Sequence, residues 1–411
     1  MKIALLGYGK EGKATEKYFL SHFNDVKIDI FENETPVELQ AHDYTSYDFV
    51  FRSPSIPPLG LANETSITRF FFDHCPCKII GVTATKGKGT TCSFIKALLD
   101  SGGHDAYLVG NIGVPALEVL DSLTETSVVV YEMSSFQLWD LNKSPFIAVI
   151  GQLEPDHINV HGSYENYLAA KSNIVRYQTS HDYCIFYQNN PESVSLAELS
   201  PAIHRFSYPF SIPAAVQSAI TLPGQHNQNN AIAAIAAVAC YLQLSPQDYL
   251  ETHQAEIIAG LASFHGLPHR LEFLRELRGV KYYDDNFSTN PSSTRVAVNA
   301  FPGQNLVIIV GGRDKTNNAD IPEIYDILKT PNIKSIILLG ESGRELNNRY
   351  QDSRFLPVSS LEQAVSSAQQ IAENLGPNSI VLMSPSAASF DMFKDVYERG
   401  RLYQTLVSAL N

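Results

Sequence analysis

The stretch "GVTATKGKGTT" at residues 81–91 lies between the end of an apolar run, "CKIIGVT", and a helical pattern, "SFIKALLD". A buried strand, a glycine-rich turn and a helix in this order are typical of loops that hold nucleotide phosphates with backbone N–H groups. Gly87 supplies the turn, and Lys88 supplies a positive charge for the phosphates. The stretch therefore predicts a parallel α/β domain with a nucleotide at the carboxyl end of its strand.

The usual loop carries a magnesium-binding hydroxyl directly after its lysine, and here Gly89 occupies that position. We expect Thr90 to take the hydroxyl role, with Thr91 as the alternative. Ala84 also stands where a further glycine is usual. A glycine-rich strand-to-helix turn without a ligand is the other interpretation of these residues.

The rest of the chain alternates apolar strands with helical segments, which favours mostly parallel sheets. Its 411 residues are too many for one core, because domains usually contain about 100–200 residues. We predict three α/β domains: a small Rossmann-like domain at 1–73, a central P-loop ATPase-type domain with a parallel sheet at 74–263, and a Rossmann-like C-terminal domain at 264–411. Helices are expected at 165–177 and 227–242, and a strand at 127–136.

Composition excludes several classes of protein. A net charge of −13 argues against a nucleic-acid binder, which would need a basic face. Five cysteines form no disulfide framework, and "HCPC" (74–77) lacks the second Cys/His pair of a zinc site. The apolar run at the N-terminus is too short for a signal sequence or a membrane span. We therefore expect a cytoplasmic protein that binds neither membranes nor nucleic acid.

A second glycine turn, "GYGKEG" (7–12), matches G-x-G-x-x-G, and Glu32 follows it at the spacing of a dinucleotide-binding fold. Alone, this turn would indicate an NAD enzyme. The shortness of the domain and the phosphate loop that follows favour a different nucleotide ligand for it.

Seven further motifs appear in order along the chain, and together they carry a resemblance. They are "GNIGVPAL" (110–117), "YEMSSFQL" (131–138), "EPDHINVHGSYENYLAAK" (154–171), "LPGQHNQNNAIAA" (222–234), "GLPHRLEF" (266–273), "GGRDK" (311–315) and "SPSAASFDMFKDVYERG" (384–400). With these motifs the chain resembles the Mur ligase superfamily, ATP-dependent amide-forming enzymes of peptidoglycan precursor synthesis. "SSFQL" and "SPSAASFD" are similar to the members that add D-glutamate.

The resemblance implies a reaction, its substrates and its cofactors. ATP would phosphorylate the carboxylate of UDP-N-acetylmuramoyl-L-alanine, and the amine of D-glutamate would then displace the phosphate. The resemblance also implies two magnesium ions, which would supply part of the electrostatic stabilisation that phosphoryl transfer needs. The first domain would bind the UDP substrate, the central domain ATP, and the third domain D-glutamate.

The resemblance also implies roles for individual residues. The ATP-binding loop would comprise Thr85, Lys86, Gly87, Lys88, Gly89, Thr90 and Thr91. The catalytic group would comprise Lys88, Asn111, Glu132, His157 and Lys171, and magnesium would be held by Thr90, Glu132, His157 and Lys171. Lys171 matches a lysine that this family carries as a carbamate, whereas a solvated helix lysine is the simpler interpretation.

Four residues would complete the ATP site. Asn227 and Asn230 resemble adenine contacts, although Asn227 could instead cap the helix that follows. Arg270 would reach the γ-phosphate and Asp285 the ribose, both from the third domain and therefore only when the domains close.

The two substrates would each have their own residues. Those for UDP would be Gly9, Lys10, Glu11, Ser53 and Pro54, and those for D-glutamate would be Lys315 and Ser389. The chain departs from the family in "DDNFSTN" (284–290), where Asn286 and Phe287 replace the usual Ser-Lys pair.

Two other classes of function remain open. "GKGTT" and "DDNFSTN" are compatible with another amide ligase of the superfamily, such as a folylpolyglutamate synthetase or one that adds a different amino acid. A non-catalytic nucleotide-sensing or NAD-binding protein is the third possibility, but it leaves Glu132, His157 and Lys171 without a role. No feature of the sequence predicts an oligomer interface, so we expect a monomer.

Overall fold

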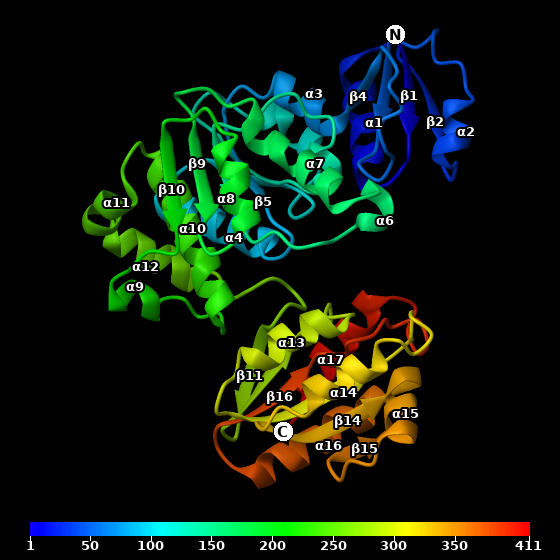
Figure 1. Ribbon diagram of the computed structural model, residues 1–411, viewed down its shortest axis with the longest axis vertical. Coiled ribbons are helices and arrows are strands. Elements are labelled where there is room, and N and C mark those ends of the chain that lie inside the picture. The colour runs from blue at the N-terminus through cyan, green and yellow to red at the C-terminus, as the bar shows by residue number, and fades with distance from the viewer. The chain divides into compact units, whose positions relative to one another are not determined.

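The computed structural model describes residues 1–411 and contains three β-sheets (Figure 1). The chain packs as two units, the first made of Met1–Thr221 with His226–Phe264 and the second of Leu222–Gln225 with His265–Asn411. Two of the sheets belong to the first unit and one to the second, and each unit is described separately. The α/β fold class is confirmed, and the domain boundaries stay predictions.

The N-terminal sheet has four parallel strands in the order β2-β1-β3-β4. Gly7, with a φ of +84°, turns the chain from β1 into α1, and a Cβ at Gly12 would lie 2.6 Å from the Gly7 carbonyl oxygen. Both glycines are therefore needed for α1 to begin so close to the strand. The elements are β1 (Lys2–Leu6), α1 (Lys10–His22), β2 (Lys27–Phe31), α2 (Pro36–Gln40), β3 (Phe49–Arg52), β4 (Glu64–Ser66) and α3 (Ile67–His74).

The central sheet has six parallel strands in the order β10-β9-β8-β5-β7-β6. Its inner strands β5, β7 and β8 are almost wholly buried, as expected for parallel strands with helices on both faces. The strands are β5 (Lys78–Thr83), β6 (Ala106–Gly110), β7 (Val128–Glu132), β8 (Ile147–Ile150), β9 (Tyr183–Tyr187) and β10 (His204–Tyr208).

Helices cover this central sheet, and the first of them, α4 (Lys88–Ser101), begins at the lysine of the phosphate loop. The others are α5 (Ser135–Leu138), α6 (Ile158–His161), α7 (Tyr164–Arg176), α8 (Pro191–Glu198), α9 (Ala214–Ser218), α10 (Gln225–Tyr241), α11 (Pro246–Thr252) and α12 (Gln254–Ser263), with 3₁₀ turns at Ala116–Glu118 and Leu120–Ser122. The predicted helices at 165–177 and 227–242 are therefore present as α7 and α10.

The C-terminal sheet, in the order β11-β12-β16-β13-β14-β15, is mixed, because β11 pairs antiparallel with β12 while the others are parallel. The sheet carries helices on both faces. Its elements are β11 (Glu272–Leu277), β12 (Val280–Asp284), α13 (Pro291–Asn299), β13 (Asn305–Gly311), α14 (Ile321–Leu328), β14 (Ile333–Leu339), α15 (Gly340–Arg349), β15 (Phe355–Pro357), α16 (Leu361–Leu375), β16 (Ser379–Met383) and α17 (Val396–Ala409).

Two sequence-based predictions are wrong in detail. The predicted strand at 127–136 ends at Glu132, because Ser134 and Gln137 form a capping box that starts α5. Asn227 does not cap a helix, since α10 begins at Gln225 and Asn227 lies within its first turn.

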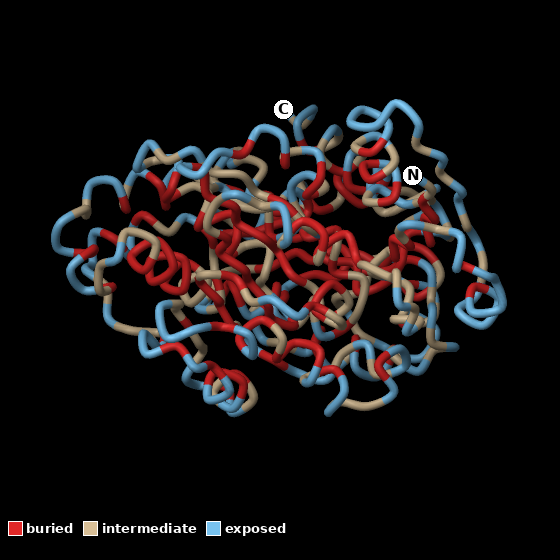
Figure 2. Tube along the Cα trace, turned by 90° about the horizontal axis from the view of Figure 1, so that it is seen from above, coloured by how far each residue is buried: buried red, intermediate tan, exposed pale blue.

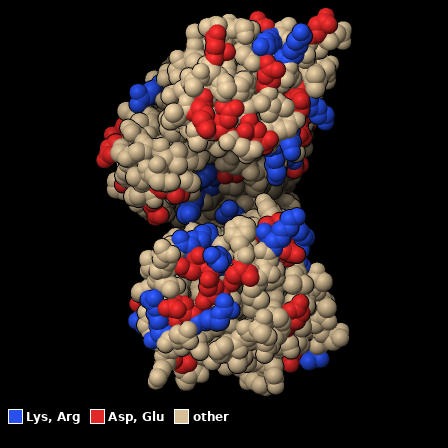
Figure 3. All heavy atoms as spheres, turned by 90° about the vertical axis from the view of Figure 1, so that its right-hand side faces the viewer, with Lys and Arg blue, Asp and Glu red and all other residues tan.

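The distribution of buried and charged residues is that of an ordinary folded protein. The strands and the helix faces that pack against them supply most of the buried residues, and the exposed residues lie mainly on the outside of the traced chain (Figure 2). Acidic and basic side chains are interspersed on the face drawn in Figure 3. None of the helices has the length and apolar character that crossing a membrane requires.

Candidate functional site

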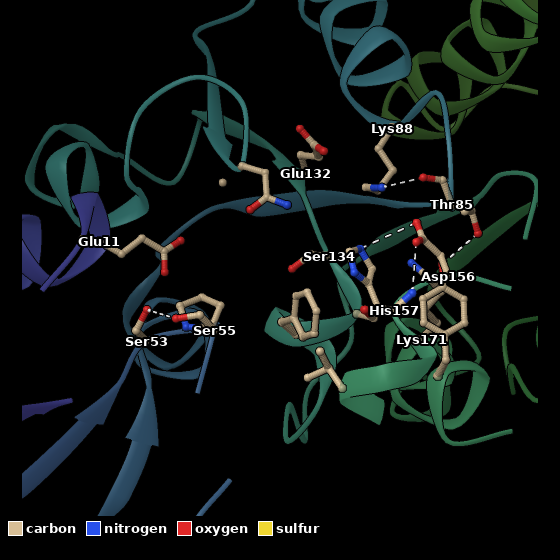
Figure 4. A pocket seen from close by; sticks show the side chains of 18 of the residues that line it. Glu11, Ser53, Ser55, Thr85, Lys88, Glu132, Ser134, Asp156, His157 and Lys171 are labelled. Atoms are coloured by element: carbon tan, nitrogen blue, oxygen red, sulfur yellow. Dashed lines mark hydrogen bonds and ion pairs between the residues drawn. The ribbon is translucent and has the colours of Figure 1, made fainter. Parts of the chain in front are cut away.

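A cavity of about 650 Å³ in the first unit lies at the carboxyl ends of β5, β6 and β7 (Figure 4). We call it the main cavity. It is lined by Gly9, Lys10, Glu11, Ser53, Pro54, Ser55, Thr85, Lys88, Gly110, Asn111, Glu132, Ser134, Ser135, Phe136, Asp156, His157, Val160, Tyr167 and Lys171. Ligands bind at this edge of open parallel sheets, where loops and helix N-termini converge.

The phosphate loop places its lysine in the main cavity. Gly87 has a φ of +84°, and a Cβ there would lie 2.7 Å from Asn230 Oδ1 of α10. Only glycine suits this turn, after which α4 starts at Lys88. The Lys88 Nζ donates hydrogen bonds to the carbonyl oxygens of Ala84 at 2.9 Å and Thr85 at 3.2 Å. The amine is thus held over the loop, beside the backbone N–H groups at the start of α4.

Lys171 is a buried cation next to that loop. Only 1% of the residue is exposed, and its Nζ donates to Thr83 Oγ1 and to the Ala84 carbonyl, each at 3.0 Å. Burial, reinforced by the charge of Lys88, holds the pKa of the Lys171 amine well below its usual value. A neutral amine at this position is a nucleophile, unlike a solvated lysine on a helix surface.

Oxygen and nitrogen ligands line the main cavity near Lys88 and Lys171. Glu132, the last residue of β7, is 9% exposed, and Asp156 and His157 come from the loop after β8. His157 has a left-handed backbone with a φ of +53°, and its N–H donates to Asp156 Oδ1 at 3.0 Å. In Figure 4 these side chains and Lys171 converge on the space in front of Lys88. Carboxylates at a phosphate loop are the hard ligands that magnesium prefers, so the residues present fit that ion.

The other end of the main cavity is built by the N-terminal sheet. Glu11 Oε1 accepts a hydrogen bond from Gln137 Nε2 of the central sheet at 3.2 Å, while its buried Oε2 has no protein partner. Burial raises the pKa of Glu11. Arg52 is fully buried, and its guanidinium donates to Glu64 and to Asp140 at 2.9 and 2.6 Å. This pairing fixes the start of the Ser53 loop against the central sheet.

The main cavity brings together eleven of the predicted residues, from the N-terminal and central parts of the first unit. They are Gly9, Lys10, Glu11, Ser53, Pro54, Thr85, Lys88, Asn111, Glu132, His157 and Lys171. The other predicted loop residues and α10 residues do not line it; these are Lys86, Gly87, Gly89, Thr90, Thr91, Asn227 and Asn230. Asn230 nevertheless contacts Gly87 of the loop, and Thr91 is only 5% exposed.

Sequence reasoning missed several residues that line the main cavity. Asp156 lies inside a motif already quoted, directly before His157, and Ser134 and Ser135 follow Glu132 at the end of β7. Their position after a buried strand was the available signal, since polar residues there face the ligand edge of the sheet. Tyr167 gave no such signal, because its hydroxyl reaches Thr85 Oγ1 at 2.8 Å only through the packing of α7.

The second unit carries the four remaining predicted residues at or near the carboxyl ends of its strands. The Arg270 guanidinium carbon lies 5.7 Å from the centroid of the Phe287 ring, so the residue that replaces the usual lysine supports an arginine by a cation–π contact. Lys315 follows β13, and Ser389 follows β16 with its buried hydroxyl lacking a protein partner.

The loop that presents Arg270 is fixed by a polar network in the second unit. His269 Nδ1 lies 2.7 Å from Asp284 Oδ2, and Gln404 Nε2 donates to Asp284 and to Glu272. The three ligand-type side chains of His269, Glu272 and Asp284 are close enough for a metal ion, but the Gln404 amide already satisfies them. This cluster is therefore a structural support.

Asp285, the predicted ribose ligand, is buried. Its Oδ1 accepts from the Leu271 N–H at 3.2 Å and its Oδ2 from the Ser384 hydroxyl at 2.8 Å. Burial raises its pKa from the usual 3.8 to about 7. The stabilisation from this raised pKa is fully present below the unfolded value of 3.8, and it is lost as the pH rises through about 7.

Replacing Asp285 by asparagine should remove this pH dependence. We expect the melting temperature of Asp285→Asn, relative to the unsubstituted protein, to rise between about pH 5 and about pH 8. Asp352→Asn is the control of opposite sign, because the Arg354 guanidinium lowers the pKa of Asp352. Its relative melting temperature should stay constant between about pH 5 and about pH 8, and should fall with rising pH only in the acidic range below about pH 5. A flat difference for Asp285→Asn would contradict the assignment.

Comparisons with known proteins identify the family to which the chain is similar. Residues 82–216 match the model of the Mur ligase middle domain, and residues 269–387 match that of the Mur ligase glutamate ligase domain. The UDP-N-acetylmuramoylalanine–D-glutamate ligase of Acetivibrio thermocellus is 32% identical, over 89% of this chain and 83% of the relative. That of Clostridium kluyveri is 30% identical, over 98% and 93%.

Solved structures share the fold. The UDP-N-acetylmuramate-alanine ligase of Thermotoga maritima superimposes with a TM-score of 0.62 at 16% identity, covering 100% of this chain and 99% of that one. The MurF ligase of Thermotoga maritima, solved with ADP, gives a TM-score of 0.57 at 14% identity, covering 88% and 89%. The sequence identity to the two curated relatives, which extends over most of their length, decides the family. The chain therefore belongs to the Mur ligase family and is an ATP-dependent amide ligase.

Proposed function

We propose that this protein adds D-glutamate to UDP-N-acetylmuramoyl-L-alanine through an acyl phosphate, with release of ADP and phosphate. The observation that carries the proposal is the main cavity, in which the glycine-turn residues of the N-terminal sheet face Lys88, Glu132 and Lys171 of the central sheet. One end suits a nucleotide-linked substrate and the other a triphosphate. The curated relatives named above carry the same activity in their names.

The residues of the main cavity divide the work of phosphoryl transfer. Lys88 and the backbone N–H groups at the start of α4 bind and neutralise the transferring phosphate. Asn111 offers an amide at the end of β6, beside the place where the substrate carboxylate would meet that phosphate. Phe136 and Val160 add apolar side chains to the lining of the main cavity.

Magnesium, when bound, would reduce the negative charge of the phosphates. We propose that Glu132 and His157 hold two ions together with Lys171 as a carbamate. Asp156 adds a carboxylate that the sequence-based set lacked. The neutral Lys171 amine could attack carbon dioxide, releasing one proton and becoming an anionic oxygen ligand. This chemistry gives a reason for burying a lysine beside another lysine.

Residues of the second unit complete the proposal. Arg270 would bind the γ-phosphate and Asp285 the ribose, while Lys315 and Ser389 would hold the two carboxylates of D-glutamate. Asn227 and Asn230 would contact the adenine from α10. The cytoplasmic location and the monomeric state stay predictions.

The test is ATP-dependent phosphate release with UDP-N-acetylmuramoyl-L-alanine and magnesium, compared across D-glutamate, L-glutamate, L-lysine and L-alanine. Turnover with D-glutamate alone is the expected result. Turnover with another amino acid only would keep the family and overturn the proposed acceptor. If none supported turnover while ATP still bound, the UDP substrate would be wrong, and a folate-type acceptor would be tested next.

A second experiment tests which threonine of the phosphate loop supplies the magnesium-binding hydroxyl, since Gly89 occupies its usual position. We expect Thr90→Ala to reduce turnover by about 10- to 100-fold through weaker magnesium binding, so that higher magnesium partly restores it. Thr91→Ala is the matched control, because Thr91 is buried in α4 and should affect stability more than the magnesium requirement. If Thr91→Ala changed the magnesium requirement and Thr90→Ala did not, the roles would be exchanged.

A further inference from the structure

Cys75 and Cys77 form a close pair of thiols that the ligase chemistry does not use. Their sulfur atoms lie 3.6 Å apart, and the Cys75 Sγ also lies 3.6 Å from the Cys77 carbonyl oxygen. Both side chains are partly exposed, whereas the other three cysteines of the chain are buried. Cys75 and Cys77 are therefore the two thiols of this protein that solvent can reach.

The backbone holds the two cysteines in place. The Cys75 N–H donates to the Phe71 carbonyl at 2.8 Å and ends α3, with Cys75 in an extended conformation. Lys78, directly after Cys77, already pairs with Val128 in the central sheet. The intervening Pro76 has a restricted φ, so little conformational freedom separates the two sulfurs. The two sulfurs are therefore held close together before any bond forms between them.

A small cavity of about 330 Å³ gives reagents access to the pair. Both cysteines and Pro76 line it, together with two lysines, Lys78 and Lys143, and one acid, Glu125. The contact with Cys77 lowers the pKa of the Cys75 thiol, which increases its thiolate fraction, while the pKa of the Cys77 thiol is raised. The two sulfurs thus differ in the way that an attacking and a resolving thiol differ.

Metal binding is a weaker use of the pair. A soft ion such as zinc takes four ligands in a structural site, and no third His, Cys, Asp or Glu ligand atom joins the two sulfurs. Two thiols are sufficient, however, for a disulfide.

We propose that Cys75 and Cys77 are a redox-active dithiol that closes to an intramolecular disulfide on reaction with a low-molecular-weight disulfide. The Cys75 thiolate attacks one sulfur of the reagent, whose S–S bond breaks and releases one thiolate. The Cys77 sulfur then attacks the Cys75 sulfur of the mixed disulfide and displaces the second thiolate. Two electrons pass from the dithiol to the reagent, and the two cysteine protons end on the two released thiols.

The experiment treats the full-length protein with oxidised glutathione and follows it by intact-mass spectrometry and peptide mapping. The unsubstituted protein should lose two hydrogen atoms, retain no glutathione, and yield one peptide with a Cys75–Cys77 disulfide that dithiothreitol reverses. Cys77→Ser should instead keep one glutathione on Cys75, because the resolving thiol is absent. Cys75→Ser should likewise form no intramolecular disulfide, because only one thiol of the pair remains.

Cys184→Ala is the matched control, since Cys184 is fully buried in β9 and burial raises the pKa of its thiol to about 12. This variant should form the disulfide at the rate of the unsubstituted protein. Glutathione that stays on the unsubstituted protein, thiols that do not react, or a disulfide involving another cysteine would each overturn the proposal. Melting curves of the serine variants exclude unfolding as the cause of altered reactivity.

Discussion

Lys88→Ala is expected to reduce ATP-dependent phosphate release by about 10²- to 10³-fold. The Lys88 amine is the only lysine nitrogen of the loop that lines the main cavity, and in phosphoryl transfer a positioned cation acts mainly on the charge that develops in the transition state. The loss should therefore appear in kcat more than in the KM for ATP. Steady-state kinetics with saturating magnesium measures both constants.

Lys96→Ala is the control for this prediction. Lys96 lies on the same helix, α4, but its amine pairs with Asp100 on the exposed face, away from the main cavity. We expect this variant to keep nearly full activity, since surface ion pairs contribute little. Full activity in Lys88→Ala, with an unchanged melting temperature, would show that the loop does not bind the transferred phosphate.

Lys171→Ala is expected to reduce turnover by at least about 10²-fold. The substitution removes the amine, the proposed carbamate and two hydrogen bonds, and it leaves the Thr83 hydroxyl and the Ala84 carbonyl in a buried space. A small carboxylate such as formate or acetate could enter that space and replace the two carbamate oxygens. Partial recovery of turnover with these anions is therefore the expected signature, measured against chloride at equal ionic strength.

Lys171→Met separates loss of a ligand from loss of packing. Methionine fills nearly the same volume and leaves no room for the added anion, so this variant should stay inactive in formate. If both variants responded equally to carboxylates, or if neither responded, the result would contradict the carbamate. Lys171 would then act as an amine. A parallel measurement on the unsubstituted protein, prepared without carbon dioxide and then given bicarbonate, should show activity returning with the carbamate.

Local sequence patterns were sufficient for much of the fold and for part of the site. The strand, glycine turn and helix of residues 81–91 are present as β5, its loop and α4. Strands with weak or short apolar patterns were missed. They are β4, β6, β9, β10, β11 and β15. In β10, for example, most residues are exposed, so no alternation of apolar and polar residues marks it.

The composition of the main cavity was predicted less completely. Glu132 and His157 were assigned from the quoted motifs. Tyr167 stands in the same motif as His157 but was not assigned, since it lines the cavity through the packing of α7 beside β5. The antiparallel β11 at one edge of the C-terminal sheet was also not predicted, since pairing direction depends on which strand lies next to it.

The sequence by itself determined the α/β class, the phosphate loop and the order of the family motifs, because these depend on residues close together in the chain. Tertiary structure decided the chemical state of the groups. Glu11 meets Gln137 across 126 positions, and Lys171 meets Thr83 across 88. Burial then lowers the pKa of Lys171 and raises that of Asp285. The reason is physical: desolvation depends on every atom packed around a group, and packing brings together segments that the local pattern of the chain does not relate.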